Sequence, residues 1–513
     1  MNGAEALLRT ATLAGVELCL ANPGTTEMQL VAALDSVPGL RAVLGLFEGV
    51  CTGAADGYAR MTHKPALTLL HLGPGFANGI ANLHNARRAR VPVVNLIGDH
   101  ASWHRPFDAP LSSDIESLAR PVSKWVRSSA SAKDLARDGA EAIHAALTPP
   151  CGVASLIVPQ DCAWDAAEGP ARVPPLPAPE AASDRAIAAA AEALGAGAAA
   201  LLFLGGEALD ARALRAAERI VARTGCRALF ETFFTRLERG GDLPAFERLP
   251  YFPEQAGEAL APCRHVVLAG TREPVAFFGY PGGRSRLAAE GARLHVLASP
   301  GEAVADALEA LAERVGAPSS PRAPRPARPA RPSGRLDPAR LGQAIAALQP
   351  EGAIVVDEAA TSGLAYLGFS AGAPPHSVLS LTGGAIGQGL PCAAGAALAC
   401  PDRKVIAFQA DGSGMYTVQA LWTCAREALD VVAVVCSNRV YRILQAELGR
   451  AGIAEPGRNA RALTDLSHPD LDWVSLARGL GVRGTRVDTA EAFCDAFARA
   501  VAEPGPSLIE AVL

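Results

Sequence analysis

The sequence predicts an α/β fold of three domains, each a doubly wound parallel sheet with helices on both faces. A chain of 513 residues has room for about three domains of ordinary size. Short apolar runs alternate with helical patterns in three successive blocks, which is typical of helices that connect parallel strands. Fifty Gly and 39 Pro supply the tight turns that such repeated units need. The domains are expected at residues 1–170, 184–316 and 337–513.

Apolar runs bounded by turn residues mark the strands of the first two blocks. The first block is expected to contain strands at Glu17–Ala21, Ala42–Leu46, Ala66–His71, Val93–Ile97 and Val153–Val158. A Pro- and Ala-rich linker, Pro170–Pro179, follows. The second block is expected to contain strands at Ala199–Leu204, Ala228–Glu231, Val266–Ala269 and Leu294–Leu297.

Residues 317–336 are rich in Pro and Arg and predict an extended, solvated linker. Their positive charge leaves an acidic partner as the alternative. The segment that closes the third block, Pro504–Val512, resembles Cys151–Pro159, which closes the first. This short similarity suggests that the two outer blocks are related.

Composition excludes several classes of function. The formal net charge of −5 argues against a nucleic-acid or anionic-membrane partner. Eleven Cys are scattered without a C-x-x-C pair, so neither a zinc site nor a disulfide framework is expected. The sequence shows no apolar run of about 18 residues and no secretory signal, so a cytoplasmic location without membrane attachment is predicted.

The most informative segment, residues 404–442, predicts a strand, an acidic turn, a helix, a second strand and a turn that bears Asn. The runs Val405–Phe408 and Val431–Val435 read as buried parallel strands. As neighbours in one sheet their ends would lie about 5 Å apart. The carboxylate of Asp411 and the amide oxygen of Asn438 would then reach one hard cation such as Mg²⁺.

Gly412 and Ser413 open the predicted helix after the acidic turn. Free backbone N–H groups and the positive end of the helix dipole favour a diphosphate there. An ordinary βαβ unit with a polar turn is the alternative interpretation of this segment.

Polar residues also follow strands of the first block. Glu48 stands between the run ending at Leu46 and the Gly-rich helix that contains GAADGYAR, where a helix-capping role is the alternative. His71 follows the strand at Ala66 and precedes Gly-Pro-Gly; a lone His in this place is more often a structural hydrogen-bonding group. Two further motifs are NPGTTE at Asn22–Glu27 and the Gly-rich GGAIGQGLP at Gly383–Pro391.

Together these motifs resemble those of thiamine diphosphate (ThDP)-dependent enzymes such as benzoylformate decarboxylase, acetolactate synthase and pyruvate oxidase. The resemblance covers nearly the whole chain and is least specific in the central block and the Pro-rich linker. It implies outer domains that bind the pyrimidine and the diphosphate of ThDP, around a Rossmann-like central domain. The signature Gly-Asp-Gly followed by Asn-Asn is present with two changes, Ala410 for the first Gly and Ser437 for the first Asn.

The resemblance also implies roles for single residues. Asp411, Asn438 and the backbone carbonyl of Val440 would bind Mg²⁺. Gly412, Ser413, Asn438 and Tyr441 would contact the cofactor near its diphosphate.

At the other end of the cofactor, Glu48 would hydrogen-bond the aminopyrimidine and promote its imino tautomer. The Gly384 carbonyl would bind the aminopyrimidine amine, and Ile386 would wedge beneath the junction of the two rings. His71 would shuttle protons, and Thr25 would hydrogen-bond a substrate carboxylate.

The implied activity is decarboxylation of a 2-oxo acid through an enamine on ThDP, with release of an aldehyde. Acetolactate synthase-type carboligation is the alternative, although the Phe-Gln pair of those enzymes is absent before Lys124. Phe277, Phe278 and Tyr280 stand where benzoylformate decarboxylase has a second His, and suggest an apolar pocket wall. A ThDP-binding protein without catalysis is a third reading, and FAD is not expected because the central block shows no clear FAD fingerprint. The resemblance further implies a homodimer or homotetramer with the active site at the subunit interface.

Overall fold

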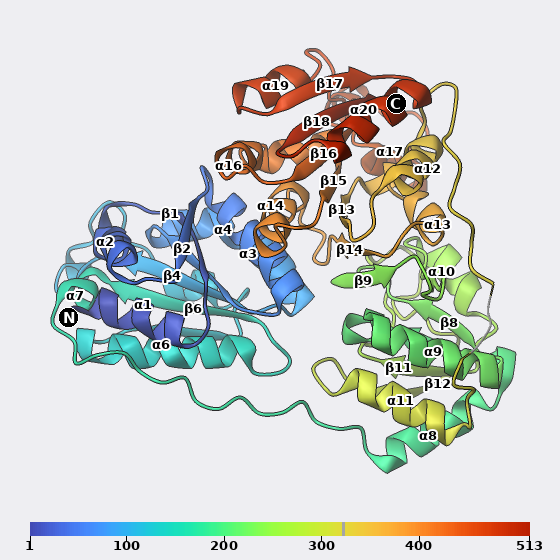
Figure 1. Ribbon diagram of the computed structural model, residues 1–513, viewed down its shortest axis with the longest axis horizontal. Helices are drawn as coiled ribbons and strands as arrows, with labels where there is room; N and C mark the ends of the chain where they lie inside the picture. Colours follow the sequence, from blue (N-terminus) through green and yellow to red (C-terminus); the bar gives the residue numbers. More distant parts are fainter. Residues whose placement is uncertain (321–323) are drawn as a thin grey trace. The chain divides into compact units, whose positions relative to one another are not determined.

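The computed structural model describes residues 1–320 and 324–513, which form two compact units (Figure 1). Unit 1 combines Met1–Leu176, Pro329–Leu367 and Ser380–Leu513, and unit 2 combines Pro177–Arg328 and Gly368–Leu379. Three sheets built mainly from parallel strands confirm the predicted α/β class. Of the predicted Pro- and Arg-rich linker, residues 321–323 lie outside the described residues. Among the helices of the described chain, none combines the length and the apolar character that crossing a membrane requires.

The N-terminal sheet of unit 1 has six parallel strands in the order β2-β1-β3-β4-β6-β5. Its strands are β1 (Leu18–Asn22), β2 (Arg41–Leu44), β3 (Ala66–Leu70), β4 (Val93–Asp99), β5 (Trp125–Ser128) and β6 (Val153–Pro159). One face packs on α1 (Gly3–Leu13), α2 (Met28–Ser36), α6 (Ala132–Leu147) and α7 (Gln160–Trp164). The other face packs on α3 (Glu48–Thr62), α4 (Leu72–Ala89) and α5 (Ile115–Ala119). Two separate apolar cores therefore cover the sheet, as a doubly wound sheet requires.

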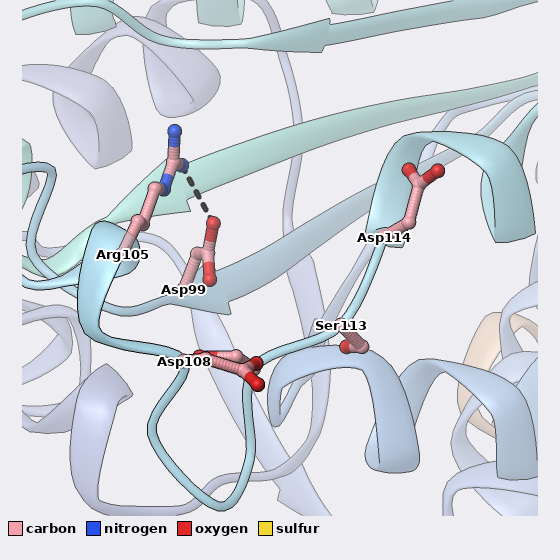
Figure 2. Close-up of a pocket in the computed structure, with 6 residues that line it drawn as sticks. Asp99, Arg105, Asp108, Ser113 and Asp114 are labelled. Carbon is pink, nitrogen blue, oxygen red and sulfur yellow. Dashed lines mark ion pairs between the residues drawn. The ribbon is translucent and has the colours of Figure 1, made fainter.

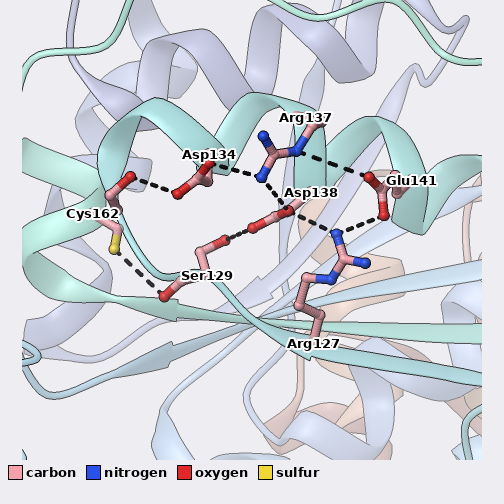
Figure 3. A network of polar contacts seen from close by, with 8 residues as sticks. Arg127, Ser129, Asp134, Arg137, Asp138, Glu141 and Cys162 are labelled. Atoms are coloured by element: carbon pink, nitrogen blue, oxygen red, sulfur yellow. Dashed lines mark hydrogen bonds and ion pairs between the residues drawn. The ribbon is translucent and has the colours of Figure 1, made fainter.

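The edge strand β5 was not predicted from the sequence, because polar contacts rather than an apolar run hold it in place. All four of its residues are only partly buried. Figure 3 shows the network: the Arg127 guanidinium lies 2.9 Å from Asp138 and 2.5 Å from Glu141, both on α6. The Ser129 hydroxyl donates to Asp138 at 2.8 Å. A carboxylate on the neighbouring helix thus fixes a strand whose own pattern is weak.

The C-terminal sheet within unit 1 runs β17-β18-β16-β15-β13. Its strands are β13 (Ile354–Glu358), β15 (Val405–Ala410), β16 (Val431–Ser437), β17 (Arg483–Val487) and β18 (Ser507–Val512). Its helices are α12 (Pro338–Leu348), α14 (Gly389–Ala399), α15 (Asp411–Gly414), α16 (Ala420–Arg426), α17 (Arg442–Arg450), α18 (Arg458–Ala462), α19 (Trp473–Gly479) and α20 (Ala490–Ala502). The order repeats β5-β6-β4-β3-β1 of the N-terminal sheet. The two similar closing segments, now β6 and β18, therefore occupy equivalent places in their sheets.

The helix predicted after Asp411 is not continuous. A short α15 is followed by a 3₁₀ turn at Met415–Thr417 and only then by α16. Gly412 and Gly414 weaken helix formation here. The Thr417 hydroxyl also donates to the Gly387 carbonyl at 2.7 Å, which holds the 3₁₀ turn against the Gly-rich loop.

Unit 2 contains a five-stranded parallel sheet in the order β10-β8-β7-β11-β12, which is the Rossmann strand order 3-2-1-4-5-6 without its sixth strand. Its strands are β7 (Ala200–Leu204), β8 (Arg227–Phe230), β10 (Glu247–Arg248), β11 (His265–Ala269) and β12 (Arg293–Ala298). Its helices are α8 (Asp184–Leu194), α9 (Ala211–Thr224), α10 (Pro253–Leu260) and α11 (Val304–Arg314). Strand β9 (Arg236–Arg239) pairs antiparallel with β14 (His376–Ser380), and α13 (Tyr366–Ser370) precedes β14 in the chain.

Helices α3 and α14 pack closely inside unit 1. A Cβ on Gly395 would lie 1.9 Å from the Ala54 carbonyl oxygen, so only glycine permits this approach. Beside it, the fully buried Arg60 and Asp56 side chains pair at 2.7 Å. Arg60 also donates to the Ser380 carbonyl at 2.7 Å. The helix that begins at Glu48 is therefore fixed to the segment that leads into the Gly-rich loop.

Candidate active site

Glu48 is the first residue of α3 and lies at the carboxyl ends of β1, β2 and β3 in the N-terminal sheet. Its carboxylate accepts a hydrogen bond from Asn78 Nδ2 at 3.0 Å. A Cβ on Gly75 would lie 3.0 Å from the other carboxylate oxygen, so α4 approaches Glu48 closely. The Asn22 amide donates to the Gly45 carbonyl at 2.9 Å and fixes the turn before Glu48. The carboxylate is only partly buried and keeps an accessible side.

His71 follows β3 directly and is held by residues of the NPGTTE segment. Its Nδ1 lies 2.8 Å from Glu27 Oε2 and 3.2 Å from the Thr26 hydroxyl. Glu27 is fully buried, and it also accepts a hydrogen bond from the Gly24 N–H at 2.7 Å. The next residue, Leu72, has a φ of +52°, a conformation that costs of the order of 1–3 kcal/mol for a residue with a side chain. The imidazole is thus tightly oriented.

Sequence reasoning did not assign Thr26 and Glu27 to the site. The predicted Thr25 is exposed on the 3₁₀ turn at Thr25–Glu27, whereas Thr26 and Glu27 turn inward to His71. The role predicted for Thr25 stays a prediction. The sequence did contain a signal for Glu27. Glu27 follows the end of β1 and His71 follows the end of β3, and the parallel pairing of these two strands brings the side chains together.

We expect the Gly24→Ala substitution to displace the His71 ring. The added Cβ would lie 2.3 Å from two atoms of that ring. Overpacking of this kind costs about 1–3 kcal/mol and here would disturb the contact with Glu27. A lower kcat and an altered pH profile are the expected results. Gly449→Ala is the matched control, because nothing lies within 4 Å of a Cβ at that position in α17. Equal kinetics for the two variants would contradict the expectation.

Side chains of α4 hold the Gly383–Gln388 loop through its carbonyl groups. Gly383 O lies 3.1 Å from His84 Nε2, and Ala385 O accepts from Asn85 Nδ2 at 2.7 Å. Among the described residues, no donor reaches the Gly384 carbonyl, to which the family resemblance assigns the aminopyrimidine amine. Ile386 stays partly exposed rather than entering the core. The roles of both residues at the cofactor stay predictions.

The two predicted metal-binding turns lie together, because β15 and β16 are adjacent and parallel with Ala410 opposite Cys436. Asp411, only 2 % exposed, accepts hydrogen bonds from the N–H groups of Gly412 at 2.8 Å and Arg439 at 2.6 Å. Burial raises the pKa of the Asp411 carboxyl, and only backbone N–H groups oppose this rise. A buried carboxylate without a basic partner fits a bound cation.

The other residues predicted to bind the metal ion or the diphosphate lie close to Asp411. Asn438 Oδ1 accepts from the Val440 N–H at 3.0 Å, and Arg439 between them has a φ of +59°. A Cβ on Gly412 would lie 2.4 Å from the Tyr441 ring, so glycine is needed there. Ser413 turns inward and accepts from Gln409 Nε2 at 2.8 Å. Among the described residues, no group of three or more His, Cys, Asp and Glu side chains can hold a metal, so a metal here would need amide and carbonyl oxygens.

A polar pocket that was not predicted lies at the carboxyl end of β4. Figure 2 shows residues that line it: Asp99, Arg105, Asp108, Ser113 and Asp114. Arg105 pairs with Asp99 at 2.6 Å, at the end of β4. A Cβ on Gly73 would lie 1.9 Å from the Ser113 hydroxyl, so the pocket wall touches the start of α4 next to His71.

Comparison with known proteins agrees with this geometry. Residues 1–118 match the N-terminal TPP binding domain of thiamine pyrophosphate enzymes, and residues 360–511 match the C-terminal TPP binding domain. TPP and ThDP are the same compound. The chain is 51 % identical to the "Putative acetolactate synthase large subunit IlvX" of Mycobacterium tuberculosis, over 100 % of this chain and 99 % of that one.

Decarboxylases are also similar to this chain. Benzoylformate decarboxylase of Pseudomonas aeruginosa is 30 % identical over 97 % of this chain and 96 % of its own length. The ThDP-dependent 4-hydroxybenzoylformate decarboxylase of Rhodococcus jostii RHA1 superposes with a TM-score of 0.87 at 27 % identity, covering 99 % of this chain and 98 % of that chain. The sheets, the two matched domains and these full-length similarities lead to one conclusion: the chain belongs to the thiamine diphosphate-dependent enzymes, in the group that includes benzoylformate decarboxylases and acetolactate synthases.

Proposed function

We propose that this protein uses ThDP and Mg²⁺ to decarboxylate a 2-oxo acid and release an aldehyde. The observation that carries the proposal is the His71–Glu27 contact of 2.8 Å at the sheet edge that also bears Glu48. The similarity to two decarboxylases of aromatic 2-oxo acids supports the same reading. When bound, ThDP supplies the electron sink that stabilises the carbanion left by CO₂ loss.

The residues of this chain would bind and orient the cofactor. Asp411, Asn438 and the Val440 carbonyl would hold the metal ion. The Gly384 carbonyl and the Ile386 side chain would fix the pyrimidine end. Glu48 would hold a proton at the pyrimidine ring, where general acid–base catalysis contributes about 10²–10⁴-fold to a rate.

His71 would deliver the proton that completes aldehyde formation. A carboxylate only accepts hydrogen bonds, so the Glu27 contact places a hydrogen on His71 Nδ1. The other ring nitrogen, Nε2, is then left to take up and give back a proton. The imidazole side chain is 22 % exposed, so the ring is not sealed inside the core. Once Nε2 has taken up a proton from water, His71 can donate it, which favours aldehyde release over capture by a second carbonyl compound.

Acetolactate synthase-type carboligation, a transferase reaction, is the second candidate. The similarity to IlvX at 51 % identity favours it. It requires that a second 2-oxo acid reach the site faster than a proton does. A ThDP-binding protein without catalysis is the remaining possibility, and only Ala410 and Ser437 support it. FAD has no part in any of these proposals.

We also propose a homodimer or homotetramer whose active sites lie between subunits. In the enzymes that this chain resembles, the domain equivalent to that of Glu48 in one subunit faces the domain equivalent to that of Asp411 in another. Both subunits therefore contribute to each site. Activity should therefore fall when dilution dissociates the oligomer. Sedimentation combined with activity measurements over a range of protein concentrations would check this.

Product analysis separates the candidate functions. The purified protein, with ThDP and Mg²⁺, is incubated with pyruvate alone and with a panel of aryl and branched 2-oxo acids. Release of CO₂ with the matching aldehyde, and no acetolactate from pyruvate, would support the proposal. Acetolactate from pyruvate would favour the carboligase instead. Bound ThDP without CO₂ release from any substrate would leave the non-catalytic reading.

A further inference from the structure

Glu358, at the carboxyl end of β13, is a buried carboxylate outside the residues assigned above. Its Oε1 accepts hydrogen bonds from the N–H groups of Gly387 at 2.7 Å and Gln388 at 3.2 Å. Its Oε2 accepts from the Gly389 N–H at 2.6 Å and from Gln409 Nε2 at 2.9 Å. One side chain therefore collects three successive backbone N–H groups where the Gly-rich loop enters α14.

Gln409 extends this contact to the diphosphate turn. It stands opposite Glu358 in the register of β13 and β15. The same Nε2 group that donates to Glu358 also donates to the Ser413 hydroxyl at 2.8 Å. A continuous chain of hydrogen bonds therefore runs from the Gly387–Gly389 backbone through Glu358 and Gln409 to Ser413.

The position of Glu358 is tightly defined. The residue is 4 % exposed, and burial raises the pKa of its carboxyl while Gln409 and the N–H groups of the loop oppose the rise. A buried carboxylate is retained only where its oxygens are satisfied, so each of these donors matters. A Cβ on Gly389 would lie 2.8 Å from Glu358 Oε2 and 2.2 Å from Gln409 Oε1. Neither the loop nor the two side chains can shift alone.

We propose that Glu358 is a positioning residue that fixes the Gly384 carbonyl and Ile386 relative to the turn at Asp411–Ser413. The proposal rests on the ThDP site described under the proposed function. Glu358 itself does not touch the cofactor in this proposal. It acts by fixing the distance between the segment for the pyrimidine and the segment for the diphosphate.

The Glu358→Gln substitution tests the proposal. The amide keeps the shape of the side chain but turns an –NH₂ group toward backbone N–H donors. Three measurements apply: amide hydrogen exchange of residues 383–389 in the apo-protein, the ThDP dissociation constant from fluorescence titration, and the rate at which bound ThDP exchanges its C2 proton. We expect amide exchange to rise, ThDP affinity to fall and C2 exchange to slow, each by about tenfold or more.

Asp138→Asn is the matched control, because Asp138 is also a buried carboxylate but lies in the α6 network of Figure 3. It should lower the unfolding temperature and leave the three measurements within twofold of wild type. Equal responses of the two variants would overturn the positioning role. If Glu358→Gln does not fold, Gln409→Leu removes the link to Ser413 and keeps the loop N–H bonds. That variant should still weaken ThDP binding, and unchanged binding would overturn the proposal.

The two proposals fail in different ways. Wild-type protein that binds ThDP but turns over no 2-oxo acid would overturn the proposed function, while apo-protein exchange and ThDP affinity would still report on Glu358. Wild-type protein that decarboxylates a 2-oxo acid, with Glu358→Gln equal to it in all three measurements, would overturn only the positioning role.

Discussion

Glu48→Gln should keep most ThDP binding and lose turnover by about 10²–10⁴-fold, the range that a single general acid–base group contributes. Glutamine keeps the length of the side chain and still accepts the hydrogen bond that Asn78 Nδ2 gives to Glu48 at 3.0 Å. It cannot exchange a proton with the pyrimidine ring. Steady-state kinetics on the best 2-oxo acid, together with fluorescence titration of ThDP, would measure both effects.

Glu17→Gln is the control for loss of a negative charge in the same domain. Glu17 lies at the surface, where it pairs with Lys64 at 2.6 Å, and surface ion pairs contribute little to stability. Its substitution should leave kcat unchanged. Turnover by Glu48→Gln at the level of Glu17→Gln would remove Glu48 from the mechanism. Loss of ThDP binding in step with turnover would instead assign Glu48 to cofactor retention.

Apolar runs predicted most of the strands that are buried on both faces, although the buried strands β13 and β14 were not predicted individually. The two strands around Asp411 and Asn438 were predicted as neighbours, and the pairing of β15 with β16 confirms this. The strands β5, β9 and β10 were missed, because they are short and carry charged residues such as Arg127 and Arg236. The pattern of apolar and polar residues along a short segment does not reveal a strand that is held in place by side-chain contacts with distant residues.

The residues of the candidate site also fall into those that the sequence predicts and those that it misses. Residues at strand ends, such as Glu48, His71 and Asp411, are visible from sequence because parallel strands place their carboxyl ends at one edge. Residues that orient them were missed, because their partners are far away in the chain. Asn85 holds Ala385, 300 positions away, and Glu358 holds Gly387, 29 positions away. Thr25 was assigned from the resemblance alone, and nothing in the sequence marks Thr26 as the hydroxyl that lies 3.2 Å from His71 Nδ1.

Asp411→Asn should remove most of the stabilisation that ThDP and Mg²⁺ give to the folded protein. Burial raises the pKa of this carboxyl because the ionised form loses hydration, and a bound cation would compensate for that loss. A neutral amide attracts the cation far less, so we expect the dissociation constant to rise by at least about a hundredfold. At a ligand concentration 100 times the wild-type constant, stabilisation should fall from about 2.7 to about 0.4 kcal/mol. Thermal unfolding with and without ligands would measure this.

The apo-protein should respond much less to the same substitution. Asparagine removes a buried charge, which favours the folded state, but it also removes one acceptor for the N–H groups of Gly412 and Arg439, which costs about 1 kcal/mol. The two effects oppose each other, so the apo unfolding temperature should change by only a few degrees. Asp402→Asn, at an exposed position in the same domain, should keep the full ligand-induced shift. An unchanged shift in Asp411→Asn would place the cation elsewhere, and the assignment of Asn438 and Val440 would fail with it.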